Sequence, residues 1–408
     1  MEKLALLGGK PAKTASFPAW PQYDQKEEQA LMEVLHSGVW WRTPGTKTLQ
    51  FEQEFAAYQQ TRYGIACTNG TAALEIVMAA LGIGLGDEVI VPDFTFVATA
   101  SAVLFAGALP VFVDIDPDTY CIDVNQIEAA ITPRTRAVIA VHVAGHPADL
   151  DRLQEICRIH NLFLIEDCAH AHGSEWKGKR VGGFGAAGTF SFQASKLMTA
   201  GEGGMIVTNN EDLAVRLRSV HDCGRMPGRW FYAHYMYGSN YRLSEWQGAV
   251  LLQQLSRLDE QAAIRIRNAA YLNKALAEIE GIRPQKLDER VTRHGQYCYI
   301  FHYDPRSFSG LSCEKFIEAL NAEGIPTQAS YPPLHRLDVF TNGEFRRRLL
   351  PEHVASSPDF TKANYPVSDD AAKNTVWLVH RTLLGTKEDT AEIVEAVRKI
   401  QRHAKELL

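Results

Sequence analysis

The stretch 188-GTFSFQASKLMTAGEGGMIVT-208 contains one cation, Lys196, among small, hydroxyl and apolar residues. A strand-like run at 189–192 precedes the lysine, and a second run at 204–208 follows a glycine-rich turn. Lysines normally lie on solvated surfaces, which these neighbours do not provide. Apolar surroundings destabilise an ammonium ion and lower its pKa, which makes the amine a usable nucleophile and base. The stretch therefore raises the hypothesis that Lys196 has a chemical role.

Outward from this stretch, short apolar runs rich in β-forming residues alternate with longer segments of helical period. The predicted strands are 88–92, 111–115, 137–143, 162–167, 189–192 and 204–208, and the predicted helices are 71–81, 95–106, 123–131 and 149–160. Several of the strands are apolar on both faces, as a parallel sheet covered by helices requires. The alternating order predicts a three-layer α/β domain with a mostly parallel sheet.

The pattern changes after residue 245. A long amphipathic stretch at 244–279 predicts one or two long helices that lead to a second unit. Later elements are a strand at 295–304, a helix at 312–323 and a last helix at 387–404 that begins at Thr386. We therefore predict an N-terminal arm, a large domain and a smaller α+β C-terminal domain, at 1–14, 15–255 and 256–408.

Composition excludes several classes of protein. The chain has 408 residues, of which 46% are apolar and 22% charged, as in an ordinary globular protein with a large core. A net charge of −6 argues against nucleic acid or an anionic membrane as the main partner. The seven cysteines are scattered without a C-x-x-C pair, which favours free thiols in a reducing cytoplasm.

Residues 94–113 form an uncharged run of twenty residues, long enough to span a bilayer. Two acids, Asp93 and Asp114, flank the run, and Gly107 and Pro110 interrupt it. A buried helix, a turn and a buried strand fit this segment better, so we expect no membrane association.

A second polar group follows the predicted strand at 162–167, where the chain runs into Asp167, His170 and His172. The carboxyl ends of parallel strands are where α/β sheets place their ligands. A metal site built from these three residues with His142 and His146 is one alternative, but the spacing matches no metal motif, and we predict no metal. A hydrogen-bonded polar cluster that ends a strand is the other alternative.

A third group is the polar run Thr68–Thr71, which opens the predicted helix 71–81. Free amides at a helix start bind phosphate, and a glycine lets the phosphate approach closely, although the same run could be an ordinary N-cap. The lysine, the acid at a strand end and this helix start together match pyridoxal phosphate. Its aldehyde needs an amine, its pyridine nitrogen needs a carboxylate, and its phosphate needs amides and hydroxyls.

Seven motifs then give a family resemblance: TNGTAALE, VIVPDFTFVAT, PVFVDID, IEDCAHAHGS, TFSFQASKLMTAGEGG, GSNYRLSEWQ and YPPLH. Over nearly its whole length the chain resembles the fold-type-I pyridoxal-phosphate enzymes of the DegT/StrS sugar-aminotransferase family. Its segments FPAWPQYD, SGVWWR and VWLVHR are most similar to one branch. That branch contains the scyllo-inosose aminotransferases of aminocyclitol antibiotic synthesis and the 3-amino-5-hydroxybenzoate synthases.

The resemblance implies roles for individual residues. Lys196 falls at the position that forms the imine with the cofactor, and Asp167 at the partner of the pyridine nitrogen. His170 falls beside the ring near its 3-hydroxyl, and Phe96 at the aromatic position that stacks on the ring. The implied phosphate ligands are Gly70, Thr71, Ser191 and, from the other subunit, Asn240, which implies a homodimer with shared active sites.

The resemblance also implies candidates for the acceptor pocket. Tyr331 and His335 belong to the motif YPPLH, and Trp41 and Arg42 lie in a segment that is expected to cover the site. For the tryptophan, packing at a domain or dimer interface is an equally good interpretation.

The family's sugar dehydratases carry histidine where its transaminases carry lysine, so Lys196 favours amino transfer. We expect glutamine or glutamate as the donor and a cyclic ketone as the acceptor, most readily a keto-cyclitol such as scyllo-inosose. The alternatives are a nucleotide-sugar or sugar-phosphate aminotransferase, a dehydratase similar to 3-amino-5-hydroxybenzoate synthase, and a regulatory protein that binds the cofactor. The intact pair of Lys196 and Asp167 disfavours the regulatory protein.

Overall fold

The computed structural model describes residues 3–226 and 228–408, so residues 1 and 2 of the predicted arm lie outside it. A seven-stranded sheet in the order β1-β9-β8-β5-β4-β2-β3 forms its centre. The five strands from β8 to β3 are parallel, whereas β9 is antiparallel to both of its neighbours. The bounds are β1 Tyr63–Cys67, β2 Glu88–Pro92, β3 Leu109–Val113, β4 Thr135–Val141, β5 Phe163–Asp167, β8 Ala187–Ser191 and β9 Gly204–Thr208.

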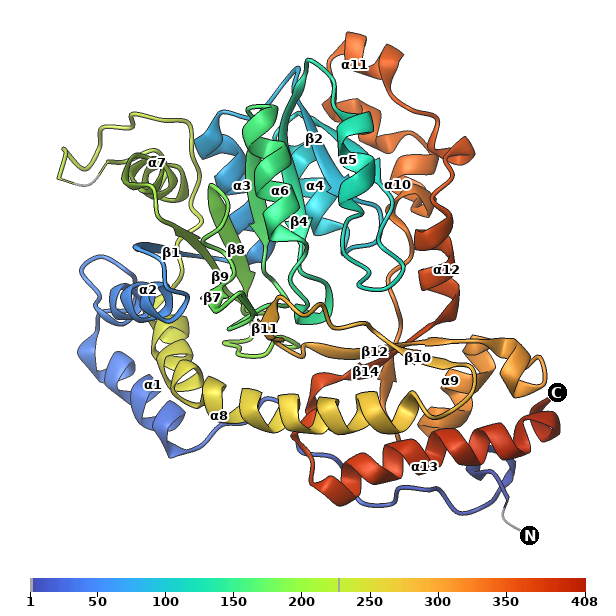
Figure 1. Cartoon of the computed structure of the whole chain (residues 1–408). Helices are drawn as coiled ribbons and strands as arrows, with labels where there is room; N and C mark the ends of the chain where they lie inside the picture. The colour runs from blue at the N-terminus through green and yellow to red at the C-terminus, as the bar shows by residue number, and fades with distance from the viewer. Residues whose placement is uncertain (1–2, 227) are drawn as a thin grey trace.

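Helices cover both faces of this sheet, with α5 and α6 in front of it and α3 and α4 behind it in Figure 1. Their bounds are α3 Gly70–Leu81, α4 Ala98–Phe105, α5 Val124–Ala130, α6 Leu150–Ile159 and α7 Glu211–His221. The N-terminal helices α1 Gln25–Ser37 and α2 Lys47–Tyr58 pack on the later helix α8, Glu245–Leu276. The predicted three-layer α/β architecture is confirmed.

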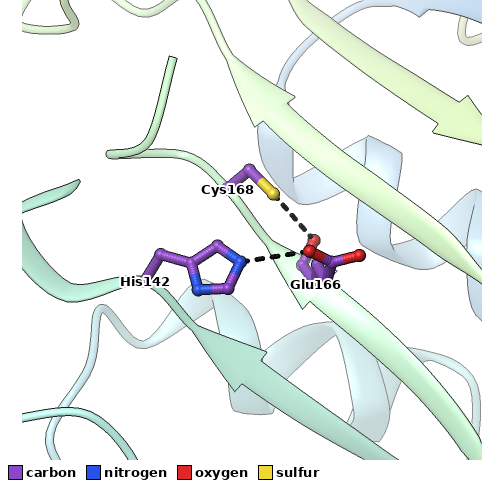
Figure 2. Close-up of side chains that lie close together, drawn as sticks. All are labelled: His142, Glu166 and Cys168. Carbon is purple, nitrogen blue, oxygen red and sulfur yellow. Dashed lines mark hydrogen bonds and ion pairs between the residues drawn. The ribbon is translucent and has the colours of Figure 1, made fainter. Parts of the chain in front are cut away.

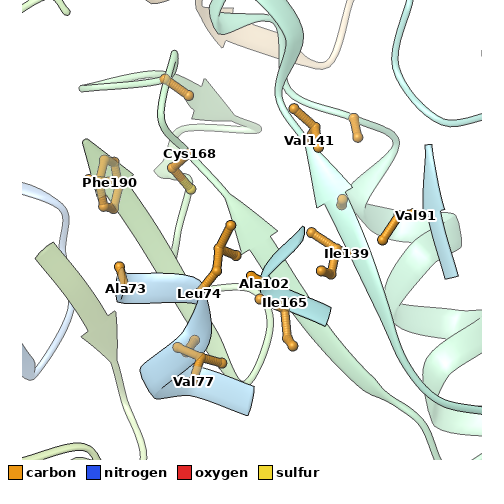
Figure 3. Packing of buried hydrophobic residues seen from close by; sticks show 14 of the residues in the cluster. Ala73, Leu74, Val77, Val91, Ala102, Ile139, Val141, Ile165, Cys168 and Phe190 are labelled. Carbon is orange, nitrogen blue, oxygen red and sulfur yellow. The ribbon is translucent and has the colours of Figure 1, made fainter. Parts of the chain in front are cut away.

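The core around the seven-stranded sheet is formed by residues from the apolar runs of the sequence. Figure 3 shows Leu74 and Val77 of α3 facing Ile139, Ile165 and Phe190 of the sheet. All five side chains are buried, because parallel strands covered on both faces leave no solvated side.

The segment 94–113 forms helix α4, a turn at Gly107 and strand β3. The predicted strand at 111–115 begins two residues earlier, so Pro110 lies inside β3. A proline is tolerated there because β3 is an edge strand and pairs only with β2. Among the described helices, none combines the length and the apolar character needed to cross a bilayer.

Helix α8, Glu245–Leu276, is a single helix of 32 residues that runs from the large core into a second one. The second core lies between α8, α9, α13 and a four-stranded antiparallel sheet in the order β10-β12-β14-β13. The bounds are α9 Cys313–Ala322, α13 Lys387–His403, β10 Ile282–Pro284, β12 Cys298–Tyr303, β13 Thr327–Gln328 and β14 Thr375–Val379. A small third sheet contains β6 Glu175–Trp176, β7 Lys179–Arg180 and β11 Val291–Arg293.

The C-terminal part does not pack only on itself. Phe340, Phe345 and Phe360 pack with Phe112 of β3 and belong to the large core. They come from the segment of short helices α10 Asp338–Thr341, α11 Pro351–Ser356 and α12 Pro366–Asn374. The division at residue 256 stays a prediction, because α8 and this segment join the two cores.

Candidate active site

A cavity of about 780 Å³ opens where several strands of the large sheet end. Strands β1, β5 and β8 run in the same direction, so their carboxyl ends meet at one edge and place the following loops around this cavity. The predicted site residues that line it are Gly70, Thr71, Phe96, Asp167, His170, Ser191, Lys196 and Tyr331. The fold thus brings together residues separated by up to 261 positions.

The start of α3 forms one end of the cavity. The side chain of Asn69 caps the helix by accepting from the amide of Ala72 at 2.8 Å, whereas the amides of Gly70 and Thr71 have no acceptor among the described residues. A Cβ atom on Gly70 would lie 2.8 Å from Cβ of Ser191, so only glycine fits beside the serine. Unpaired amides, a hydroxyl and a close backbone approach form a cradle that suits a phosphate group.

Lys196 follows β8 in a loop that faces the cavity. Its side chain is half-buried, and its amine lies 4.5 Å from the centre of the Tyr297 ring. Burial lowers the pKa of Lys196 to about 8, although Asp167 opposes the shift. At pH 7 about one tenth of the amine is therefore neutral, against less than about one in a thousand at the ordinary pKa.

Asp167 ends β5 and is buried against the floor of the cavity. Its carboxylate accepts from the hydroxyl of Thr99 at 3.0 Å and from the amide of Ala169 at 3.1 Å. Burial nevertheless raises the pKa of Asp167, so a cationic group placed against this carboxylate would stabilise its ionised form. The protonated nitrogen of a pyridine ring is such a group.

Three rings form the wall next to Lys196. His170 stacks on Tyr297 with ring centroids 4.0 Å apart, and its Nε2 lies 3.1 Å from the hydroxyl of Tyr331. The Nδ1 atom of His170 is buried without a partner among the described residues. Burial lowers the pKa of His170 well below its usual range, so the ring is neutral and retains hydrogen-bonding capacity toward the cavity.

The histidines proposed above as metal ligands do not converge on one point. Within residues 3–226 and 228–408, only His142, Glu166 and Cys168 bring three potential ligand atoms within 4.8 Å of one another. Figure 2 shows His142 pointing at Glu166, with Nε2 3.3 Å from the carboxylate. The amide of Ala148 donates to the other ring nitrogen at 3.0 Å, which fixes the proton on Nε2.

The carboxylate of Glu166 is likewise engaged in hydrogen bonds within the protein. Its two carboxylate oxygens accept from the amides of Gly182, Phe184 and Gly185 at 2.7–2.8 Å. His142 first, and then the amides of Gly182 and Gly185, lower the pKa of Glu166 despite its complete burial. The triplet therefore holds the loop 182–185 against the end of β5, as the hydrogen-bonded alternative for this segment requires.

Four predicted site residues do not line the cavity. Asn240 is exposed on the loop before α8, and Trp41 is 43% exposed beside Arg242. Arg42 forms a bidentate ion pair with Glu52 at 2.7 and 3.1 Å.

His335 is fully buried behind the cavity wall, where its ring nitrogen and amide both bond to Asp93 at 2.7 and 2.9 Å. Asp93 directly follows β2, and its carbonyl accepts from the amide of Leu334. The pair therefore anchors the segment that presents Tyr331 to the cavity.

Several residues that line the cavity were not predicted from the sequence, among them Thr99, Tyr297, Glu75 and Glu202. Thr99 lies one helical turn after Thr95 in a motif already noted, and this spacing could have indicated a shared face. Tyr297 leads into a strand of the other sheet, so no local pattern relates it to Lys196.

Comparison with known proteins agrees with this geometry. The profile of the DegT/DnrJ/EryC1/StrS aminotransferase family matches residues 21–398. The chain is 41% identical over 419 residues to an L-glutamine:2-deoxy-scyllo-inosose aminotransferase of Streptoalloteichus tenebrarius, covering 99% of both chains.

Solved structures agree as well. The crystal structure of a 3-amino-5-hydroxybenzoic acid synthase superimposes with a TM-score of 0.87 at 38% identity, covering 95% of this chain and 99% of that one. A Bacillus subtilis structure with bound cofactor PMP matches with a TM-score of 0.82 at 26% identity, over 96% of this chain and 86% of the other. These enzymes depend on pyridoxal phosphate and transfer an amino group from a donor to a keto acceptor. The chain described here belongs to the DegT/DnrJ/EryC1/StrS aminotransferase family.

Proposed function

We propose that this aminotransferase uses pyridoxal phosphate to move the amino group of glutamine or glutamate to a keto-cyclitol. The residues that line the cavity fit the cofactor. Gly70, Thr71 and Ser191 would hold its phosphate, and Phe96, which is 56% exposed into the cavity mouth, would cover its ring. Asp167 would face the ring nitrogen. A cation at that place would stabilise the ionised form of the buried carboxylate.

The bound cofactor supplies an electron sink next to the carbon that loses or gains the amino group. Lys196 supplies the proton transfers, because its amine is largely protonated at pH 7 yet releases the proton at a pH close to neutral. The ring of Tyr297 lies against the amine and holds it within the cavity. The neutral His170 and the hydroxyl of Tyr331 form a hydrogen-bonded edge that orients what is bound beside Lys196.

The charge of the cavity supports an uncharged, hydroxyl-rich acceptor. Lys196 is the only cationic side chain among the described residues that line the cavity, whereas Glu75, Asp167 and Glu202 are acidic. A nucleotide diphosphate or a ring carboxylate would call for further cations. Carboxylates accept hydrogen bonds from hydroxyl groups. A keto-cyclitol such as scyllo-inosose presents a hydroxyl group on each ring carbon apart from the carbonyl carbon.

We also propose that the active unit is a homodimer. The loop before α8 exposes Trp230, Tyr232, Tyr235 and Tyr237 to between 51% and 97%. Exposed aromatic clusters of this size are typical of protein interfaces. Asn240 belongs to the same loop and lies away from its own cavity, so the partner's cavity is where the resemblance would place it.

Product analysis tests the acceptor. The purified protein loaded with pyridoxal phosphate is incubated with glutamine and, in separate reactions, scyllo-inosose, a nucleotide-linked keto-sugar and aminodehydroshikimate. We expect amination of scyllo-inosose, and Glu75→Gln to raise the KM for this ketone several-fold. Exclusive turnover of either other acceptor would refute the cyclitol assignment. Failure of both glutamine and glutamate to bleach the visible absorbance would favour the regulatory protein instead.

A further inference from the structure

Arg265 lies in the middle of α8 and is fully buried, and none of its side-chain nitrogens has a hydrogen-bond acceptor among the described residues. A buried guanidinium without acceptors is strongly unfavourable, so the group requires an explanation. The activity described above does not use it.

Two other unpaired groups belong to the same region. His172 holds the carbonyl of Ser191 through Nε2 at 2.9 Å, and His380 holds the carbonyl of Ser195 through Nε2 at 3.1 Å. A carbonyl only accepts, so each Nε2 carries the proton and each Nδ1 is an acceptor. Both Nδ1 atoms are buried without a partner among the described residues.

Packing brings the helix that carries Arg265 against the short segment that begins at His380. Helix α8 packs against the short helix η7, His380–Leu384, and Asn268, one turn after Arg265, donates to the carbonyls of Leu383 and Gly385 at 2.8 Å. Burial lowers the pKa of both His172 and His380, and the charge of Arg265 adds to the shift of each ring.

The donors and acceptors are complementary. Arg265 has five N–H donors, and the two histidines present lone pairs, yet no direct hydrogen bond joins them. Ordered water accepts from a guanidinium and donates to an imidazole nitrogen, and buried water typically satisfies such groups. A halide would satisfy the cation but would be repelled by the two lone pairs.

We propose that Arg265 binds buried water that bridges it to His172 and His380, and that this network positions the loop that carries Lys196. The two histidines hold the carbonyls of Ser191 and Ser195, which precede Lys196 by five residues and by one. Arg265 is thus a positioning residue that acts through the start of this loop and through the residue just before Lys196. Its relevance to catalysis rests on the proposed role of Lys196, but the network itself can be tested without a substrate.

The test measures how fast an amine-acylating reagent labels Lys196 in the full-length chain prepared without cofactor. Labelled peptides are quantified by mass spectrometry at pH 7.5. Arg265→Met should slow the labelling about tenfold, since a looser, better hydrated loop raises the pKa of the amine by about one unit. His380→Phe removes no charge and replaces the imidazole by another aromatic ring without nitrogen atoms. This variant should slow the labelling in the same way. Arg267→Met, on the exposed face of α8, is the matched control and should have no effect.

The double variant distinguishes one shared network from two independent effects of Arg265 and His380 on the labelling rate. If one network acts, the double variant Arg265→Met/His380→Phe labels no more slowly than the slower single variant. Multiplied effects, unchanged labelling in Arg265→Met, or a higher unfolding temperature for that variant would each overturn the proposal. A crystal structure that shows ordered solvent gives a direct check. Water within hydrogen-bond distance of the guanidinium and both Nδ1 atoms supports it, and a bromide signal at that place after soaking refutes it.

Discussion

Replacing Lys196 by methionine should stabilise the chain that lacks cofactor. Burial lowers the pKa of the amine from 10.5 to about 8, a difference of about 2.5 units, and each unit corresponds to about 1.4 kcal/mol. The protonated amine therefore destabilises the folded chain by at most about 3.5 kcal/mol. Because part of the side chain faces solvent, we expect Lys196→Met to raise the free energy of unfolding at pH 7 by about 1–3 kcal/mol.

The same shift predicts how this difference changes with pH. Between pH 8 and 10.5 the unfolded chain still holds the proton that the folded chain has released, so the wild type gains stability as the pH rises. The advantage of the methionine variant is complete below pH 8 and disappears by about pH 10.5.

Urea unfolding followed by tryptophan fluorescence between pH 7 and 10.5 measures both quantities. Lys274→Met, at an exposed position of α8, is the control and should show no comparable gain. The reasoning would be refuted by a Lys196→Met variant that is no more stable than the wild type at pH 7. A difference that stays constant over the whole pH range would also contradict it.

The remaining predictions concern activity and two structural contacts. Lys196→Ala should retain bound cofactor, visible in the absorbance spectrum, but lose turnover, and turnover at the wild-type rate would exclude the assigned role. His335→Phe should lower the free energy of unfolding by about 3 kcal/mol in urea titrations, because the buried Asp93 loses its side-chain partner and keeps only the backbone amide of residue 335. Gly70→Ala should weaken cofactor binding at least tenfold in equilibrium dialysis, because its Cβ would press on Ser191 at 2.8 Å. Ala72→Gly, two residues further along α3, should not weaken it comparably.

Local patterns predicted much of the large domain, and the physical reason is periodicity. Buried parallel strands are apolar on both faces, and helix α3 begins where its capping residue stands, so both are visible in a short window. Strand β1 was not predicted because Tyr63–Cys67 includes a glycine, which weakens a strand pattern. Strand β3 was shifted because Pro110 normally ends a strand, and only its edge position in the sheet permits it.

The residues of the candidate site also divide into those that local sequence patterns identify and those that only the tertiary structure places. Lys196 and Asp167 could be identified from the sequence because each is a polar group in an apolar context, at the end of a predicted strand. Tyr297 and His335 could not be placed, since one reaches the cavity from the segment that leads into β12 of the second sheet and the other bonds to Asp93.

By itself, then, the sequence determined the α/β class, most strands of the central sheet and the groups able to do chemistry. Only the tertiary structure decided which of these groups face one cavity, how far burial lowers the pKa of Lys196, and which strands lie at the edges of the sheet. The reason is that side-chain period and capping act over a few residues, whereas desolvation depends on atoms brought together from the whole chain.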